Sequence, residues 1–515
     1  MTMRTRFAPS PTGYLHIGGV RTALFNWLLT RRHNGQFVLR IDDTDTERNR
    51  DEALQPILDG FRWLGIDWDE GPEIGGDHGP YYQSQRSQSY TDAAMKLLDT
   101  GFAYPSYETK EELDEARKKA IADKINFVFR GKHRDTLPAE CRKLYDANPT
   151  ILRFKIPDDQ TIVMDDLIRG RVEWQCNLIG DPVILRADGR PLYNFATVVD
   201  DVNMGITHVI RAAEHLDNTK IQSLIYQAMD YAVPKFAHVP VVNEPNSKKK
   251  LSKRKMAKFL TKEVRATLHK IGWTDEEIDS RDDLNPATVA YYKELGYLPA
   301  AVVNYLGRLG WSLDDKSEII PLPEMIANFS LDRVNDSPAG FDPDKLLWVA
   351  GEYMKQLPLA EKVAGVLPFL KRVRLLEDPI SDRAMTMLEQ LVEACGDRLK
   401  VFSDIHNFAP LFLTADPEYD AKAVDKKLKK DPVPDLLSEF REVLAKTNPF
   451  DVPTLETALV DYCEAKGVKK NLLIHGLRVA TTGQEVGVGL FEGLVILGKD
   501  ETLRRIDLGL EKAKS

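Results

Sequence analysis

Cysteines and long apolar runs are both scarce in this sequence. Its 515 residues include only four cysteines, which are scattered and form neither a CxxC pair nor a disulfide framework. No apolar run reaches the roughly 20 residues that a membrane-spanning helix needs, and the first residues, MTMRTRF, lack the apolar core of a signal peptide. These absences predict a cytoplasmic protein that has no association with a membrane.

Several common catalytic and nucleotide-binding motifs are missing as well. The sequence contains no GxxxxGKS/T phosphate loop and no GxGxxG that follows a strand. No arrangement of Ser, His and Asp, or of Cys and His, indicates a nucleophilic side chain, and there is no internal repeat. The sequence therefore favours neither a P-loop protein nor an enzyme that forms a covalent intermediate on its own side chain.

Positive charge is in deficit, because 70 basic residues against 79 acidic ones give a net charge of −9. This balance alone does not predict a nucleic-acid binder. Basic residues nevertheless cluster, and a phosphate backbone responds to a local basic face rather than to the mean charge. The clusters are Lys248–Lys250 with Lys253–Lys255, Lys426–Lys430 and Lys466–Lys470. Each is more often a solvated surface, so together they permit RNA binding without requiring it.

What the sequence does contain is a distinctive stretch, Arg6–Gly19, which reads RFAPSPTGYLHIGG. Residues Thr5–Ala8 predict the end of a strand, the PSPTG run predicts a tight loop, and apolar residues at helical spacing after Gly19 predict a helix. A helix start offers N–H groups and a positive dipole end that suit a phosphate, and Gly18 leaves room for one. His16 can donate a hydrogen bond to a phosphoryl oxygen. The stretch therefore predicts a nucleotide site, although HIGG alone is also compatible with an ordinary helix start.

Polar side chains stand at the ends of three predicted strands. Asp42 follows the predicted strand Phe37–Ile41, and Arg211 ends another that begins at Thr207. The segment Leu192–Asp201 predicts a third strand, which ends in two acids. Ligands of open α/β sheets bind outside the carboxyl ends of the strands, so we expect these side chains to line the site.

Two of these positions have a second interpretation. Asp42, Asp43 and Asp45 are also compatible with a cap for the next helix, or with a metal site, although the Gly and terminal Glu of an EF-hand are missing. Arg211 could instead form a structural salt bridge with Glu214. Its place at the end of a strand favours the binding role.

The HIGG run resembles the His-Ile-Gly-His signature of class I aminoacyl-tRNA synthetases, with Gly19 in place of the last histidine. Far downstream, the segment Lys248–Lys255, which reads KKKLSKRK, is similar to the second signature of that class, Lys-Met-Ser-Lys-Ser, in its glutamyl form. With the APSPTG run and the helical pattern of its C-terminal half, the chain resembles the bacterial-type glutamyl-tRNA synthetase family over nearly its whole length.

The resemblance implies an α/β fold, with a Rossmann-like catalytic domain of the class I type and an inserted α+β acceptor-stem domain. Helical stem-contact and all-α anticodon-binding domains are expected to follow. The expected boundaries are 1–86 and 188–260 for the two halves of the catalytic domain, 87–187 for the inserted domain, 261–345 for an insert and the stem-contact region, and 346–515 for the anticodon-binding domain.

The resemblance also implies a reaction in two steps, with L-glutamate, ATP and tRNA(Glu) as substrates. Glutamate attacks the α-phosphorus of ATP to give glutamyl-adenylate and pyrophosphate, and the terminal ribose hydroxyl of tRNA(Glu) then takes the glutamyl group. Neither step needs a protein nucleophile, because positioning and charge stabilisation suffice. Mg²⁺ would arrive with ATP. In this family, exchange between ATP and pyrophosphate is expected to require tRNA.

Roles for individual residues follow from the resemblance alone. Arg211 is expected to pair with the substrate's γ-carboxylate, which a planar guanidinium binds through two hydrogen bonds. No residue is expected to bind a metal. The residues implied are His16, Lys250, Ser252 and Lys253 for catalysis, Arg6, Ser10, Asp42, Tyr193 and Arg211 for glutamate, and His16, Gly18, Gly19, Val242 and Lys253 for ATP.

Three features depart from the family pattern. Asp42 stands where a Glu usually contacts the α-amino group of the substrate, so its reach is shorter. Ser106 and Glu108 stand where some members carry zinc-binding cysteines, and Cys141 alone cannot build a tetrahedral site. We therefore expect no structural zinc. Residues 264–286 form an acidic segment that is longer than the family pattern predicts.

Alternative functions remain open. A non-discriminating glutamyl enzyme would also charge tRNA(Gln), and a glutaminyl enzyme is suggested by Asp42, the acid that glutaminyl members carry. The APSPTG run, the KLSKRK form and the helical C-terminal half argue against the glutaminyl enzyme. An RNA-binding protein without catalysis is disfavoured because His16, Lys250 and Lys253 are intact. With no heptad pattern, a monomer is expected.

Overall fold

The computed structural model describes residues 2–11, 14–44, 54–251 and 259–514. The chain divides into two compact units, and each unit combines segments that are distant in the sequence. The first unit comprises Met1–Lys255, Ala287–Ala290 and Val303–Pro343, and the second comprises Met256–Pro286, Tyr291–Val302 and Asp344–Ser515.

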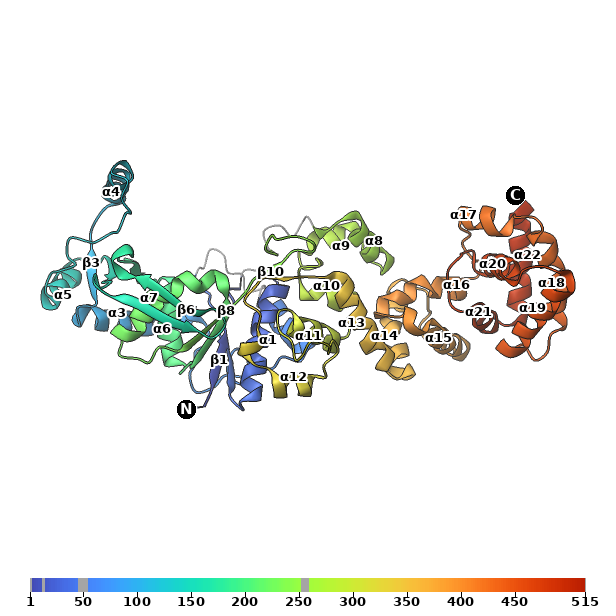
Figure 1. Cartoon of the computed structure of the whole chain (residues 1–515), viewed down its shortest axis with the longest axis horizontal. Helices are drawn as coiled ribbons and strands as arrows, with labels where there is room; N and C mark the ends of the chain where they lie inside the picture. The colour runs from blue at the N-terminus through green and yellow to red at the C-terminus, as the bar shows by residue number, and fades with distance from the viewer. Residues whose placement is uncertain (1, 12–13, 45–53, 252–258, 515) are drawn as a thin grey trace. The chain divides into compact units, whose positions relative to one another are not determined.

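The first unit is built on two strand–helix–strand arrangements of parallel strands (Figure 1). They are β1 (Arg4–Phe7), α1 (Ile17–Arg32) and β2 (Gln36–Leu39), and β8 (His208–Ala212), α7 (Thr219–Ala228) and β9 (Lys235–Val239). The two arrangements join where β1 meets β8, because the Thr207 N–H donates to the Arg4 carbonyl at 3.0 Å. Of the four predicted strands, three are confirmed: the strand before HIGG, the strand before Asp42 and the strand up to Arg211.

Helix α1 is buried over most of its surface. The predicted helix starts slightly earlier than the apolar spacing indicates, at Ile17 within the HIGG run. Its residues from Val20 to Thr30 are all buried, so polar side chains in this stretch bond to backbone carbonyls instead of water. Asn26, for example, donates to the carbonyls of Thr22 and Ile210 and thereby ties α1 to β8.

The predicted strand Leu192–Asp201 is wrong, because this segment is helix α6 (Tyr193–Asn203). Its aromatic and β-branched residues favour a strand by propensity, but propensity is a weak prior that tertiary packing overrides. Seven consecutive residues, Phe195–Asp201, are buried in the helix, and several of them join a core shared with α7. Helix α7 begins without a side-chain cap, since Asn218 precedes it and forms no side-chain hydrogen bond there.

The segment between β2 and α6 mixes helices and antiparallel strands, as the sequence predicts. β3, β4 and β7 form one antiparallel sheet, and β5 pairs with β6 in a hairpin. The elements are α2 (Gln55–Leu64), α3 (Ser87–Asp99), β3 (Ala103–Ser106), α4 (Lys110–Ala122), α5 (Pro138–Ala147), β4 (Ile151–Phe154), β5 (Thr161–Asp166), β6 (Gly170–Gln175) and β7 (Val183–Leu185).

The place of the family's zinc ligands is filled by a different polar contact. The Ser106 hydroxyl donates to the Glu108 carboxylate and accepts from Arg153 Nε at 3.0 Å. Cys141 is buried on α5, where its thiol lies 3.6 Å from the His133 carbonyl. Within the described ranges, no group of three or more His, Cys, Asp or Glu side chains is arranged to hold a metal ion.

The first unit is completed by a parallel pair of short strands and one further helix. These are β10 (Val242–Asn243), β11 (Ala339–Gly340) and α12 (Leu322–Asn328). Helices α10 (Val289–Glu294) and α11 (Pro299–Arg308) extend across the division between the units. Among the residues that the structure describes, no helix is long and apolar enough to cross a membrane.

In the second unit, every regular element from residue 344 to 514 is helical, as predicted. Two apolar clusters form its interior, one around Leu388 and Val366 and one around Phe440 and Leu477. The principal helices are α13 (Pro343–Gln356), α14 (Leu359–Arg372), α15 (Asp382–Cys395), α18 (Val433–Lys446), α19 (Val452–Lys466), α20 (Lys470–Thr482), α21 (Leu490–Leu497) and α22 (Lys499–Lys514).

The acidic segment 264–286 is folded into two short helices, α8 (Lys262–Lys270) and α9 (Asp275–Ser280). Arg265 of α8 pairs with two acids of α9, so part of the negative charge is satisfied within the segment. Trp273 lies between two guanidinium groups, at 5.0 Å from that of Arg281 and 4.8 Å from that of Arg372 on α14. The segment therefore packs on the helices of the second unit.

Candidate active site

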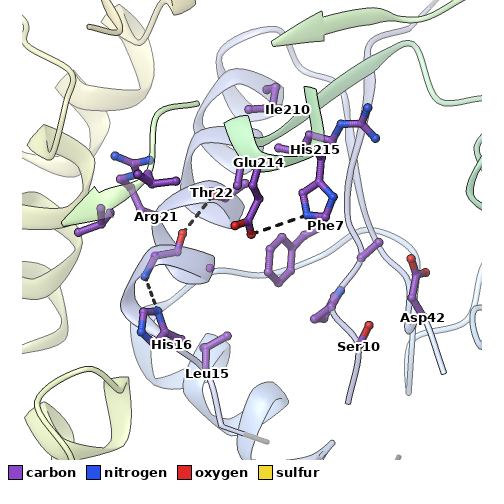
Figure 2. Close-up of a pocket in the computed structure, with 18 of the residues that line it drawn as sticks. Phe7, Ser10, Leu15, His16, Arg21, Thr22, Asp42, Ile210, Glu214 and His215 are labelled. Carbon is purple, nitrogen blue, oxygen red and sulfur yellow. Dashed lines mark hydrogen bonds and ion pairs between the residues drawn. The ribbon is translucent and has the colours of Figure 1, made fainter. Parts of the chain in front are cut away.

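A pocket of about 410 Å³ opens at the carboxyl ends of β1 and β8 (Figure 2). It brings together residues that the sequence spreads over more than 240 positions. The predicted site residues that line it are Arg6, Ser10, His16, Gly18, Gly19, Asp42, Tyr193, Arg211, Val242 and Lys250. Ser252 and Lys253 lie outside the described residues, and so does Asp45. The roles assigned to the ten lining residues stay predictions.

His16 caps helix α1 and is oriented by its own backbone. Its Nδ1 accepts a hydrogen bond of 3.1 Å from the Gly18 N–H, as Figure 2 shows. A ring nitrogen that accepts carries no proton, so in the neutral ring the proton is on Nε2. His16 is thus held as an Nε2–H donor at the helix start.

Glycines 18 and 19 are not required by the packing of the protein itself. A Cβ atom placed on Gly18 would meet its nearest neighbour, His16 Nδ1, at 3.5 Å, and one on Gly19 would meet Phe7 at 3.7 Å. Both distances are ordinary van der Waals contacts, and neither residue has a positive φ angle. The absence of side chains at Gly18 and Gly19 leaves free space on the side of the helix start that faces the pocket.

Arg211 is a buried cation whose hydrogen-bond partners are all neutral. Only 5% of its surface is exposed, and burial lowers the pKa of the guanidinium to about 10. The expected alternative, a salt bridge to Glu214, is not formed. Three of its five N–H groups are used, which leaves two. The partners are His238 Nε2 at 3.0 Å, Gln222 Oε1 at 2.7 Å and Thr219 Oγ1 at 2.7 Å.

Acids and guanidinium groups alternate along the floor of the pocket. Arg6 Nε donates to Asp201 at 3.2 Å, and Arg40 links Asp201, at 2.6 Å, to Asp42, at 2.8 Å. Burial raises the pKa of Asp42 to about 6, in spite of the opposing charge of Arg40. Asp200 does not line the pocket; it is fully buried and pairs with Arg86 at 2.6 Å. Asp42 is therefore a carboxylate that loses its charge just below neutral pH.

Among the lining residues that were not predicted from the sequence, three lie close to predicted ones. His215 lies beside Tyr193, with ring centroids 5.8 Å apart and a Tyr193 Oη to Nδ1 distance of 3.4 Å. Thr197 lines the pocket one helical turn after Tyr193, and its buried hydroxyl has no hydrogen-bond partner in the described part of the chain. The third, Glu214, contacts His215 at 3.9 Å.

Lys250, the first signature lysine, already has an acidic neighbour. Its Nζ pairs with a Glu214 carboxylate oxygen, and both side chains are about half exposed. The described start of the signature segment is also bound to β10, because the Leu251 N–H donates to the Val242 carbonyl at 2.9 Å. One of the three N–H groups of Lys250 is engaged by Glu214, which leaves two for another anion in the pocket.

The parallel βαβ core, the HIGG helix start and the pocket above the strand ends define a class I synthetase. The family described as "tRNA synthetases class I (E and Q), catalytic domain" matches residues 2–269 and 272–348, and "Anticodon binding domain" matches residues 360–510. The chain therefore belongs to the class I tRNA synthetases of the E and Q group. The predicted family and fold class are confirmed, and the match continues through the acidic segment except at residues 270 and 271.

Several proteins that are similar to this chain along nearly its full length are glutamate--tRNA ligases. It is 42% identical over 506 residues to "Glutamate--tRNA ligase" of Moorella thermoacetica, which covers 98% of this chain and 97% of the relative. It is 40% identical to "Glutamate--tRNA ligase 1" of Caldanaerobacter subterraneus subsp. tengcongensis, with 99% and 98% covered. A solved glutamate tRNA ligase from Elizabethkingia meningosepticum, in complex with its amino acid, matches with a TM-score of 0.84 at 32% identity and 99% coverage of both chains.

Proposed function

We propose that this protein attaches L-glutamate to tRNA(Glu) at the expense of ATP, through a glutamyl-adenylate intermediate, and releases AMP and pyrophosphate. The observation that carries the proposal is Arg211, a buried guanidinium that meets only neutral partners in a pocket shared with the HIGG helix start. A buried charge of this kind is costly unless a ligand balances it. The side-chain carboxylate of glutamate supplies that balance.

Glutamate would lie between cations and acids that suit its three charged groups. Arg211 would take the γ-carboxylate through its two remaining N–H groups. Asp42 would take the α-ammonium group, directly or through a water molecule. Arg6 and Ser10 would stabilise the α-carboxylate, and Tyr193 with Thr197 would cover the carbon chain. These contacts leave an α-carboxylate oxygen available to attack phosphorus.

ATP would occupy the other end of the pocket. The open side of Gly18 and Gly19 would admit the nucleotide, the backbone near Val242 would frame its base, and His16 at the helix start would interact with the phosphates. Donors aimed at the charge that develops in the transition state accelerate such a reaction. Lys250, with Ser252 and Lys253 by resemblance, would neutralise the leaving pyrophosphate. We place Mg²⁺ on the ATP phosphates, where it commonly binds with few protein ligands.

The second step needs no further catalytic group from the protein. The ribose hydroxyl at the end of the tRNA attacks the carbonyl of the adenylate, and AMP leaves. The protein contributes by holding the two reactants together, which can supply roughly 7–11 kcal/mol of the barrier in favourable cases. We further propose that tRNA(Glu) is the partner, and that the protein acts in the cytoplasm as a monomer.

The specificity for glutamate would arise from charge. Glutamine carries no negative charge on its side chain, so its binding would leave Arg211 buried without a counterion. The same argument disfavours a glutaminyl enzyme. It does not address which tRNA is charged, because the tRNA is selected by other contacts.

The test is aminoacylation of purified tRNA(Glu) and tRNA(Gln), each with radiolabelled glutamate and with glutamine. The proposal expects glutamate on tRNA(Glu) only. Glutamate on both tRNAs would identify a non-discriminating enzyme. Glutamine on tRNA(Gln) would contradict the role of Arg211, and no product with any pair would favour an RNA-binding protein without catalysis.

A further inference from the structure

His238 and Asp166 form a buried pair directly behind Arg211. His238 Nδ1 lies 2.6 Å from an oxygen of the Asp166 carboxylate, and neither side chain is accessible to solvent. On the other side of the ring, His238 Nε2 accepts from Arg211 Nε at 3.0 Å. The three side chains thus form one line of hydrogen bonds that runs from the pocket into the interior.

Asp166 determines which nitrogen of His238 carries the proton. An ionised carboxylate can only accept, so it fixes the proton on Nδ1 and leaves the lone pair of Nε2 facing Arg211. The ring is neutral in this form, in agreement with a pKa that burial lowers from the usual value. Arg211 Nε therefore donates a directional hydrogen bond to a neutral ring, and no negative charge compensates the guanidinium.

Asp166 is itself held firmly at the end of β5. One of its oxygens accepts from the N–H groups of Ile168 and Arg169, at 3.0 and 2.8 Å. The carboxylate also accepts from the N–H of His238, at 3.1 Å. The hairpin that follows β4 is bound to β9 by these contacts and by the bond from the Leu167 N–H to the Phe236 carbonyl at 2.9 Å.

We propose that His238, held by Asp166, is a positioning residue that orients the Arg211 guanidinium toward the side-chain carboxylate of the substrate. Together with Gln222 and Thr219 it holds all three nitrogens of the guanidinium, so the two remaining N–H groups keep a fixed direction. Recognition of a planar carboxylate needs orientation to within about 10–20°. This inference rests on the proposed function, because it assigns the choice of glutamate to a residue outside the pocket.

Two substitutions of His238 separate its bond to Asp166 from its bond to Arg211. Thr219 Oγ1 also lies 3.2 Å from His238 Nε2. The amide nitrogen of an asparagine lies where Nδ1 lies, so His238→Asn keeps the bond to Asp166 and loses the one to Arg211. The amide of a glutamine reaches the place of Nε2, so His238→Gln can still accept from Arg211. His208→Gln is the matched control, since His208 is half-buried at the opposite end of β8 and does not contact Arg211.

The measurement is exchange between ATP and pyrophosphate with tRNA(Glu) present, which gives a KM for glutamate and a KM for ATP for each variant. His238→Asn is expected to raise the KM for glutamate by about 10-fold or more, as for the loss of a hydrogen bond to a charged group. Its KM for ATP should stay within about 2-fold of the wild-type value, since the proposed ATP position is at the other end of the pocket from Arg211. His238→Gln should bring the KM for glutamate back to within about 3-fold, and the preference for glutamate over glutamine should fall in His238→Asn only.

Equal values for the Asn and Gln variants, or a parallel rise of both KM values, would overturn the positioning role. Rescue by Asn rather than Gln would assign His238 to holding the hairpin alone, and would overturn it too. If His238→Asn does not fold, His238→Ala also removes the bond to Arg211. It should likewise raise the KM for glutamate and leave the KM for ATP nearly unchanged. If the wild-type protein catalyses no exchange with glutamate, the proposed function fails and this inference fails with it. If the wild-type protein catalyses exchange but the His238 variants change both KM values equally, only the inference is contradicted.

Discussion

Arg211 differs from its neighbours Arg6 and Arg40 in that no acid is among its hydrogen-bond partners. Arg6 and Arg40 share Asp201, so much of their charge is balanced inside the protein. A carboxylate that enters the pocket meets one guanidinium that has already lost its water and has two N–H groups to offer. The desolvation of Arg211 has thus occurred during folding instead of during binding.

Replacing Arg211 by alanine is expected to weaken the binding of glutamate more than the binding of ATP. Removing one partner of a buried ion pair commonly costs about 3–5 kcal/mol, so kcat/KM for glutamate should fall at least about 100-fold. ATP binding should change little. Exchange kinetics give the first quantity and titration calorimetry with ATP gives the second. Arg171→Ala, on the exposed face of β6, is the control, and equal losses for glutamate and ATP would contradict the assignment.

Asp42 predicts a pH dependence of glutamate binding. Burial raises its pKa to about 6 in the free protein, so the carboxylate is charged above that pH and neutral below it. Since kcat/KM reports the groups of the free enzyme, kcat/KM for glutamate should fall as the pH drops through about 6, while the KM for ATP changes less. Exchange assays between pH 5 and 8 measure this fall, and Asp42→Asn should abolish it. A profile that is unchanged in Asp42→Asn would mean that another group titrates.

At the scale of an element, α6 shows what local pattern could not provide. A strand would place Tyr193, Phe195 and Thr197 on one face. The helix instead buries Phe195 in the core and leaves Tyr193 and Thr197 on the pocket side. The error in secondary structure preserved Tyr193, because either conformation allows it to face the ligand, but a strand would wrongly place Phe195 on the same face. The helix forms because its buried face packs against α7 and the core around it, which is information that propensity does not contain.

The Thr197 hydroxyl on α6 is expected to favour the binding of glutamate and to lower the stability of the folded protein. Its buried hydroxyl has no partner among the described residues, so Thr197→Val removes an unsatisfied polar group. The free energy of unfolding should stay the same or rise by up to about 1 kcal/mol, and the melting temperature should follow it. The same change should raise the KM for glutamate about 5-fold or more, if the hydroxyl serves the substrate. Thr197→Ser should restore the wild-type KM. A valine variant that is less stable and binds glutamate normally would show that the hydroxyl is structural.

At the scale of the whole molecule, the sequence predicted the parts of the site that lie in short motifs. His16, Gly18, Gly19 and Lys250 belong to two runs whose residue types reveal their chemistry, and all four line one pocket. Contacts between distant segments were not predictable. Glu214 meets Lys250 across 36 positions, and Asp166 meets His238 across 72. Such pairs depend on how separate strands are brought together, and a single sequence carries no local signal for them.

The two compact units predict two separable unfolding transitions in calorimetry, since each has its own apolar interior. Phe440 is fully buried in the second unit. Phe440→Ala should reduce the free energy of unfolding of that unit by about 3–5 kcal/mol and lower the midpoint of its transition. The transition of the first unit should keep its midpoint, and titration calorimetry should still detect binding of ATP to the variant. Leu359→Ala, at a position that is 38% exposed on α14, is the control. A single transition that falls as a whole would show that the units unfold as one.

The second unit takes two of its three segments, Met256–Pro286 and Tyr291–Val302, from positions that precede the end of the first unit. During synthesis these segments leave the ribosome long before α14 exists, and the contact of Trp273 with Arg372 cannot form until then. A chain truncated after residue 343 would keep both segments and lack the helices on which they pack. Isolating the first unit by itself therefore calls for replacing both 256–286 and 291–302 with short linkers, because a stop codon after residue 343 leaves the apolar surface of both segments uncovered.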